Sequence, residues 1–137
     1  MIQFIAGEKG QGKTKKLLAM ANARVEESDG NIVFIDDDSR HIYDLKHNIR
    51  FVETKGYELS TYKEFIGFLY GILSQNNDIT DIFIDGLANI ISEIPSEDLV
   101  TLIDRLKSLS TSSQVDFTIS INYVVDNLPA EAKDLLV

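Results

Sequence analysis

The sequence predicts an α/β fold in which helices flank a mostly parallel, five-stranded sheet. Short runs of β-branched and aromatic residues, such as 31–35 and 82–84, alternate along the chain with longer segments whose apolar residues recur at helical spacing. These runs are apolar throughout, which is typical of strands buried on both faces of a parallel sheet. Strands that alternate with helices join by right-handed crossovers. Residues 1–137 are expected to form one domain.

The first strand and the first helix enclose a glycine-rich loop. Residues 2–6 form a short apolar run, and residues 15–24 carry leucine and alanine on one side of a helix. Between them, residues 7–14 fit the pattern G-x-x-x-x-G-K-[ST] without departure. The glycines let successive N–H groups turn toward an anion, and the free donors at the helix N-terminus favour phosphate. A glycine-rich turn before an amphipathic helix is the simpler alternative.

The expected phosphate-binding residues are consecutive and occupy the loop and the start of the helix. They are Gly7, Glu8, Lys9, Gly10, Gln11, Gly12, Lys13, Thr14 and Lys15. Lys13 is expected to reach the β- and γ-phosphates of a nucleotide, and the Thr14 hydroxyl is expected to ligate Mg²⁺. The cofactors expected from this motif are therefore a nucleoside triphosphate and Mg²⁺.

The second strand, residues 31–35, ends in three adjacent carboxylates, Asp36, Asp37 and Asp38. Ligands of open α/β sheets bind at the carboxyl ends of the strands, so this triplet is expected near the site. Repulsion among the three carboxylates is expected to raise the pKa of one of them. The alternative is a solvated acidic turn without a role in binding.

The middle of the chain predicts an edge strand and a helix. Residues 39–46 form a short mixed segment with one or two helical turns, and residues 49–53 alternate apolar and polar, which is typical of a strand near a sheet edge. Residues 61–74 open with capping-box spacing and continue at helical intervals. Gly67 and Gly71 are expected to mark close packing of this helix.

The fourth strand ends in a carboxylate as the second strand does. Residues 80–84 are predicted to form a buried strand with the apolar run 82–84, and Asp85 and Gly86 follow it. We expect Asp85 to hold Mg²⁺ through a water molecule, opposite Thr14. Taken alone, the same residues fit a strand end followed by an Asp-Gly turn.

The last third of the chain predicts a helix, a strand and a final helix. Residues 96–109 carry acids in the first helical turn and bases in the last, and residues 110–113 predict a polar turn. Residues 115–122 form the last strand, which ends at Asn122, and a helix is expected over residues 130–136.

Together these features resemble the P-loop NTPases across nearly the whole chain. The complete phosphate loop corresponds to their Walker A motif, the strand ending at Asp85 to their Walker B motif, and Asn122 to a polar strand end. Within that superfamily the chain is most similar to the RecA-like group, which carries an acidic, often catalytic residue where Asp36–Asp38 lie. The resemblance implies a three-layer P-loop NTPase fold with strand order 3-2-4-5-1 and the phosphate-loop strand at one edge.

The resemblance implies an ATP-binding protein that hydrolyses ATP slowly with Mg²⁺. Lys13, Asp38 and Asn122 are the candidate catalytic residues: Asp38 would orient the attacking water, with Asp37 and Asp36 behind it, and the Asn122 amide would sense the γ-phosphate. Many hydrolysing relatives place a glutamate where this chain has Gly86, so hydrolysis is expected to be slow. Asn122 could instead close the turn that follows the strand.

Two other functions remain open at this stage. One is a nucleotide-gated assembly or interaction module without significant catalysis. The other is a small-molecule or nucleoside kinase, which usually needs arginines in a lid, whereas the chain has only four arginines. ATP rather than GTP is a default choice, because no pattern in the sequence distinguishes adenine from guanine.

The net charge and the residue composition argue against some classes of binding partner. A formal net charge of −9 argues against a broad nucleic-acid or membrane surface, and no apolar segment is long enough to cross a membrane. No cysteine is present to form a disulfide or a thiolate metal site, and His41 and His47 are interpreted as surface residues. A cytoplasmic protein is expected, with a nucleotide as its ligand; a homo-oligomer or a protein partner stays open.

Overall fold

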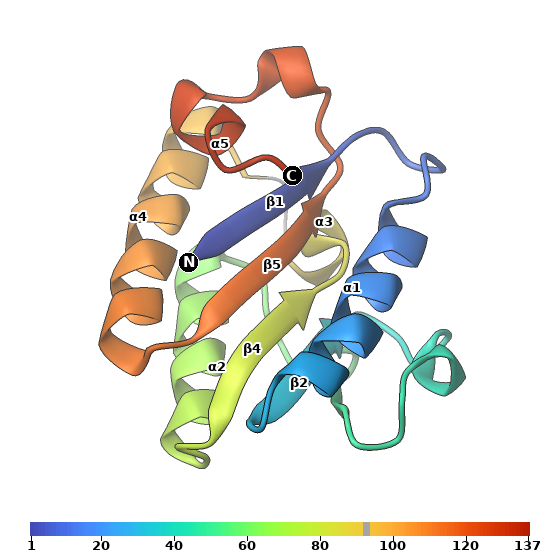
Figure 1. The fold of residues 1–137 in the computed structure, drawn as a ribbon. Coiled ribbons are helices and arrows are strands. Elements are labelled where there is room, and N and C mark those ends of the chain that lie inside the picture. The colour runs from blue at the N-terminus through green and yellow to red at the C-terminus, as the bar shows by residue number, and fades with distance from the viewer. Residues whose placement is uncertain (92–93) are drawn as a thin grey trace.

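The structure, a computed structural model, describes residues 1–91 and 94–137 (Figure 1). The strands are β1 (Ile2–Ala6), β2 (Asn31–Asp36), β3 (Arg50–Glu53), β4 (Ile79–Ile84) and β5 (Asp116–Ile121). The helices are α1 (Lys13–Glu27), α2 (Tyr62–Ser74), α3 (Leu87–Ile90), α4 (Ser96–Ser113) and α5 (Ala130–Lys133), with 3₁₀ turns η1 (Ile42–Asp44) and η2 (Val125–Asn127).

The five strands form one sheet in the order β1-β5-β4-β2-β3. All four pairings of neighbouring strands are parallel. The expected α/β class, the five-stranded parallel sheet and the strand order 3-2-4-5-1 are therefore confirmed. Because the strands are parallel, all their carboxyl ends lie at one edge of the sheet, and the polar residues that follow them meet there.

Helices cover both faces of the sheet: α1 lies on one face, and α2 and α4 lie on the other (Figure 1). Side chains along each strand alternate between the two layers. Phe34 of β2 packs in the cluster that contains Leu17 of α1, whereas its neighbours Val33 and Ile35 pack in the larger cluster that contains Phe65 of α2. The apolar character of the central strands thus reflects burial on both faces, as the sequence predicts. Among the described residues, no helix is both long and apolar enough to cross a bilayer.

Helix α4 is longer than expected, because it continues through the segment 110–113 that the sequence predicts as a polar turn. The hydroxyls of Ser112 and Ser113 donate hydrogen bonds to the carbonyl oxygen of Leu109, so these serines satisfy their polar groups within the helix. The helix ends at Ser113, and the next residue, Gln114, adopts a left-handed conformation with φ 57°.

The final helix is shorter than expected, ending at Lys133 rather than at residue 136. The residues beyond it run along the free edge of β1. The Phe4 amide donates to the Leu135 carbonyl oxygen at 2.9 Å, and the Val137 amide donates to the Phe4 carbonyl oxygen at 3.0 Å. Backbone pairing with an edge strand therefore outweighs the helical tendency of the last residues.

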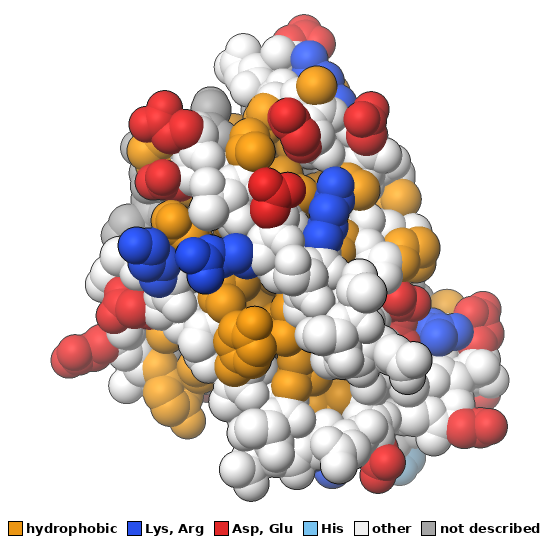
Figure 2. All heavy atoms as spheres, turned by 90° about the vertical axis from the view of Figure 1, so that its left-hand side faces the viewer, with side chains coloured by type: hydrophobic (Ala, Val, Ile, Leu, Met, Phe, Trp, Pro, Cys, Tyr) orange, Lys and Arg blue, Asp and Glu red, His pale blue; other side chains and the backbone are white. Residues whose placement is uncertain are grey.

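The capping box that opens α2 is confirmed, since the Glu64 amide donates to Thr61 and the Glu64 side chain accepts from the Thr61 amide. The close packing expected at Gly67 and Gly71 is wrong. Both glycines are exposed, and a Cβ atom at either would meet nothing within 4 Å. On the face that α2 and α4 turn to solvent, apolar side chains show between charged ones (Figure 2).

Candidate functional site

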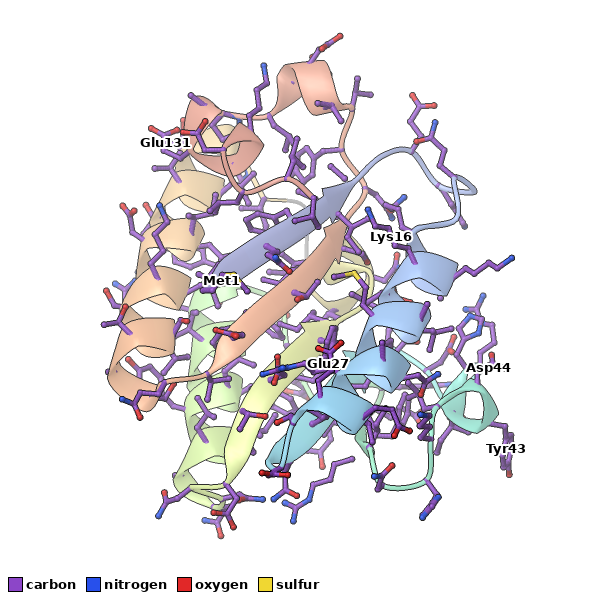
Figure 3. The ribbon with its side chains drawn as sticks, in the orientation of Figure 1. Met1, Lys16, Glu27, Tyr43, Asp44 and Glu131 are labelled. Carbon is purple, nitrogen blue, oxygen red and sulfur yellow. The ribbon has the colours of Figure 1, made fainter. Side chains whose placement is uncertain are left out.

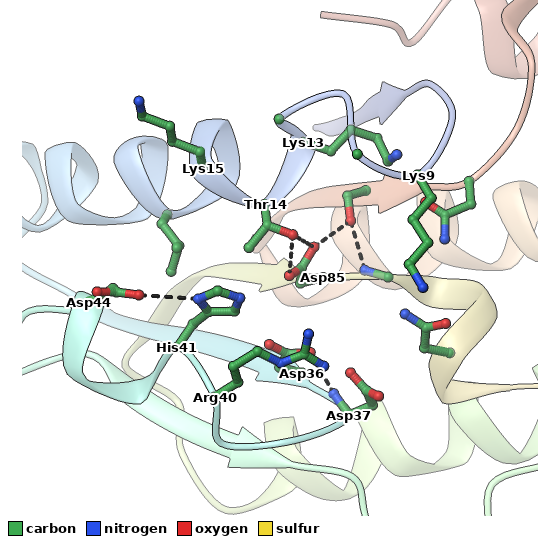
Figure 4. A pocket seen from close by; sticks show the side chains of 17 residues that line it. Lys9, Lys13, Thr14, Lys15, Asp36, Asp37, Arg40, His41, Asp44 and Asp85 are labelled. Carbon is green, nitrogen blue, oxygen red and sulfur yellow. Dashed lines mark hydrogen bonds and ion pairs between the residues drawn. The ribbon is translucent and has the colours of Figure 1, made fainter.

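A cavity of about 880 Å³ opens at the carboxyl edge of the sheet (Figure 4). Three groups of residues line it, from the glycine loop (residues 7–12) and α1, from the segment after β2, and from the ends of β4 and β5. They are Lys9, Gly10, Gly12, Lys13, Thr14, Lys15 and Leu18; Asp36, Asp37, Arg40, His41 and Asp44; and Asp85, Gly86, Asn89, Ser120 and Asn122. Most of the residues that the sequence predicts for binding or catalysis therefore share one cavity.

The glycine loop takes a shape that depends on its glycines. Gly10 and Gly12 have φ values of 89° and 80°, in the left-handed region that other residues rarely adopt. Gly12 is the N-cap of α1, so the helix begins at Lys13 with its free N–H groups facing the loop. A helix start of this kind favours an anion.

Lys13 is folded into the glycine loop. Its Nζ donates hydrogen bonds to the carbonyl oxygens of Gly7 at 2.9 Å and Glu8 at 2.7 Å, and the residue is only 8% exposed. Burial lowers the pKa of Lys13, and the charges of Asp85 and Glu8 oppose this shift. The Gln11 side chain accepts a hydrogen bond from the Glu8 amide at 2.8 Å and closes the loop further.

Thr14 and Asp85 meet across the site although they are 71 residues apart in the sequence. The Thr14 hydroxyl donates to the Asp85 carboxylate, with 3.0 Å between Oγ1 and Oδ2. Asp85 is 7% exposed and accepts a second hydrogen bond from the Ser120 hydroxyl at 2.7 Å. The Ser120 oxygen in turn accepts from the Gly86 amide at 2.7 Å. Asp85 is thus fixed in place by hydroxyl groups from α1 and β5.

Ser120 is a site residue that sequence reasoning missed. Residues Ile84 and Ile119 are paired in the sheet, so Ser120 lies beside Asp85, one position further along each strand. The signal available in the sequence is a hydroxyl residue inside an otherwise apolar strand end. Such a residue is normally placed where its oxygen finds a hydrogen-bond partner.

The acidic triplet divides into two parts with different roles. Asp36 is 4% exposed and lines the cavity together with Asp37, whose amide donates to Asp36 Oδ1 at 2.7 Å. Burial, the Asp37 side chain and the Asp85 charge raise the pKa of Asp36 to about 8. The raised carboxyl pKa expected for this triplet therefore belongs to Asp36.

Asp38 lies outside the cavity lining and faces Arg40. Its Oδ2 is 2.6 Å from Arg40 Nη2, and its Oδ1 accepts a hydrogen bond from the Arg40 amide at 2.9 Å. These hydrogen bonds lower the pKa of Asp38. The geometry accordingly favours Asp36 over Asp38 as the acid beside Asp85.

Asn122 and His41 also line the cavity. Asn122, the predicted γ-phosphate sensor, follows β5 and is an exposed part of the cavity wall. His41 is half-buried rather than on the open surface; its Nδ1 lies 3.1 Å from Asp44 Oδ2. Next to it, Tyr43 is 97% exposed and points away from the protein body (Figure 3).

The oxygen atoms in the cavity fit a hard cation. The Thr14 hydroxyl and the Asp85 carboxylate are oxygen ligands of the kind that Mg²⁺ prefers. No protein-family model matches the sequence, and no curated protein is significantly similar to it. A functional assignment therefore rests on the residues and on the geometry of the cavity.

Proposed function

We propose that the chain is a P-loop NTPase of the RecA-like type, which binds ATP with Mg²⁺ in this cavity and hydrolyses it slowly. The observation that carries the proposal is the hydrogen bond between the Thr14 hydroxyl and the buried Asp85 carboxylate. It brings the end of the glycine-loop motif to a strand-end carboxylate, which is the arrangement that a Mg²⁺–triphosphate complex requires.

The glycine loop and Lys13 would bind the phosphates. The loop amides and the start of α1 supply N–H donors and partial positive charge, and Lys13 supplies a full charge. Lys13 now donates to two loop carbonyls, so phosphate binding would transfer its hydrogen bonds to the ligand. Because Lys13 is largely buried, its attraction for phosphate is weakly screened by water.

Thr14 and Asp85 would hold the Mg²⁺ ion, which supplies neutralising charge to the phosphates. Ser120 fixes the orientation of Asp85 through its hydroxyl group. Asp36, beside them, is placed to hydrogen-bond a water molecule in the cavity. In the protein without a bound ion, burial and the acidic neighbours raise the pKa of Asp36 to about 8, so this carboxyl is mostly protonated at neutral pH.

The test of this proposal is the Mg²⁺ dependence of ATP affinity in wild type and Thr14→Val. Wild type is expected to bind ATP about tenfold more tightly with Mg²⁺ than with a chelator, and Thr14→Val is expected to lose most of that increment. Thr101→Val on α4 removes a hydroxyl far from the cavity and serves as the matched control. An unchanged Mg²⁺ increment in Thr14→Val would contradict the proposal. Turnover without a partner is expected below about 1 per second.

A further inference from the structure

Arg40 is a cation on the cavity wall to which the proposed function gives no role. It comes from the segment after β2 and lines the cavity together with Asp36 and Asp37. Its side chain is 70% exposed, and in Figure 4 its guanidinium group is drawn beside Asp36 and Asp37, below Asp85. The side chain is therefore accessible to a ligand in the cavity.

Asp38 holds Arg40 at two points. One carboxylate oxygen accepts the Arg40 backbone amide at 2.9 Å, and the other is 2.6 Å from Nη2 of the guanidinium. A guanidinium has five N–H donors in a rigid plane, so this contact leaves donors on the other nitrogens available. Within residues 1–91 and 94–137, Asp38 is the hydrogen-bond partner recorded for the guanidinium.

The charges around the cavity give a ligand phosphate a reason to meet Arg40. Asp36, Asp37 and Asp85 all line the cavity with Arg40, and together they would repel a polyanion. Arg40 offsets part of this negative charge, and the charges of Asp37 and Asp36 raise its pKa, after the larger effect of Asp38. A planar guanidinium also matches the geometry of phosphate oxygens.

We propose that Arg40 contacts the terminal phosphate of the bound nucleotide and that Asp38 is a positioning residue that holds Arg40 in place. This inference rests on the proposed function, because it requires a nucleoside triphosphate in the cavity. Lys13 and Arg40 then approach the terminal phosphoryl group from opposite walls and share the charge that develops on it. Asp38, which the sequence suggests as the group that orients water, acts on Arg40 instead.

The first experiment compares a triphosphate with a diphosphate. Affinities for a non-hydrolysable MgATP analogue and for MgADP are measured by calorimetry in wild type and Arg40→Ala. Arg40→Ala is expected to bind the analogue about tenfold more weakly and MgADP as wild type does, since only the analogue carries the terminal phosphate. Arg105→Ala on α4, across the sheet, makes the same change in net charge and is expected to affect neither ligand.

The outcomes separate this inference from the proposed function. Equal weakening of both ligands in Arg40→Ala, or no weakening of either, would overturn the role of Arg40 while leaving nucleotide binding established. Wild-type protein that binds neither ligand would overturn the proposed function and this inference together.

The second experiment tests Asp38 through a double-mutant cycle. Asp38→Ala is expected to weaken binding of the analogue several-fold without changing MgADP affinity, because Arg40 loses the contact that positions it. In the Arg40→Ala background, Asp38→Ala is expected to have no further effect. An additive loss in the double variant, or a loss of MgADP affinity in Asp38→Ala, would show that Asp38 does not act through Arg40.

Discussion

Asp36 is the side chain whose ionisation the fold changes most strongly. It is almost fully buried at the end of β2, and its pKa is raised to about 8 by burial and by its acidic neighbours. The folded protein therefore keeps this proton up to about pH 8, whereas the unfolded chain loses it near pH 4. Because the folded state binds the proton over that interval, this group's contribution to stability falls as the pH rises.

Asp36→Asn is expected to remove this pH dependence, since an amide mimics the protonated acid and can still accept the Asp37 amide hydrogen. In metal-free buffer at pH 8, the variant is expected to have a free energy of unfolding higher than that of wild type by about 1 kcal/mol or more. The advantage should be smaller near pH 5, because that pH lies closer to the unfolded pKa. Urea unfolding at both pH values measures it, with Asp104→Asn on the exposed face of α4 as control. If the difference in unfolding free energy between Asp36→Asn and wild type does not vary with pH, burial does not raise the pKa of Asp36.

Individual site residues were predictable to the extent that a local motif defines them. Lys13, Thr14 and Asp85 follow from the glycine loop and from a strand that ends in a carboxylate, and the structure brings all three to one cavity. The different environments of Asp36 and Asp38 were not predictable, because burial and the contact with Arg40 depend on how the segment after β2 turns. Adjacent identical residues carry no sequence signal that separates them.

Among the helices, α2 carries two glycines, Gly67 and Gly71, whose replacement by alanine is expected to stabilise the protein. Gly67 and Gly71 lie within this helix, where glycine is less favourable than alanine. A Cβ atom at either position would meet nothing within 4 Å. The helix therefore carries the entropic cost of two glycines without a packing reason for them.

Gly67→Ala and Gly71→Ala are each expected to raise the free energy of unfolding by about 0.5–1 kcal/mol. Gly30→Ala is the contrasting variant, because its Cβ would lie 2.1 Å from the Thr80 methyl group and 2.9 Å from the Asp78 carbonyl oxygen. That substitution is expected to destabilise the protein. Thermal or urea unfolding of the three variants measures the expected gain in stability in α2 and the expected loss at Gly30. Destabilisation by either α2 substitution would show that a packing contact constrains that position.

The positions of elements were predictable where periodicity and capping agree, as in α2, and less so at element ends. The sequence predicts a turn over residues 110–113 because serine favours turns. In the structure the Ser112 and Ser113 hydroxyls donate to a carbonyl oxygen within α4, so the helix continues. The sequence predicts a helix up to residue 136, whereas the backbone of residues 135–137 forms hydrogen bonds with Phe4 at the edge of β1. In both cases tertiary contacts decide between conformations that the local sequence leaves close in energy.

For the whole molecule, the parallel sheet is what assembles the site. Each central strand ends at the same edge, so Asp36, Asp85 and Asn122 come together beside the start of α1 although they are far apart in the sequence. The strand order was predictable through the resemblance to RecA-like proteins, and the convergence of strand ends follows from parallel pairing. Ser120 and Arg40 could not be predicted as lining residues from the sequence. Their positions depend on how the strands pair and on how the segment after β2 folds.

A calorimetric titration of MgATP into wild type and Lys13→Ala tests whether the glycine loop binds a nucleotide. Wild type is expected to give saturable binding that Lys13→Ala abolishes up to about 1 mM nucleotide, since the variant lacks the buried cation of the glycine loop. Lys16→Ala changes the net charge equally on the exposed side of α1, outside the cavity lining, and should bind as wild type does. Equal binding by wild type and Lys13→Ala, or no binding by wild type at that concentration, would contradict the account.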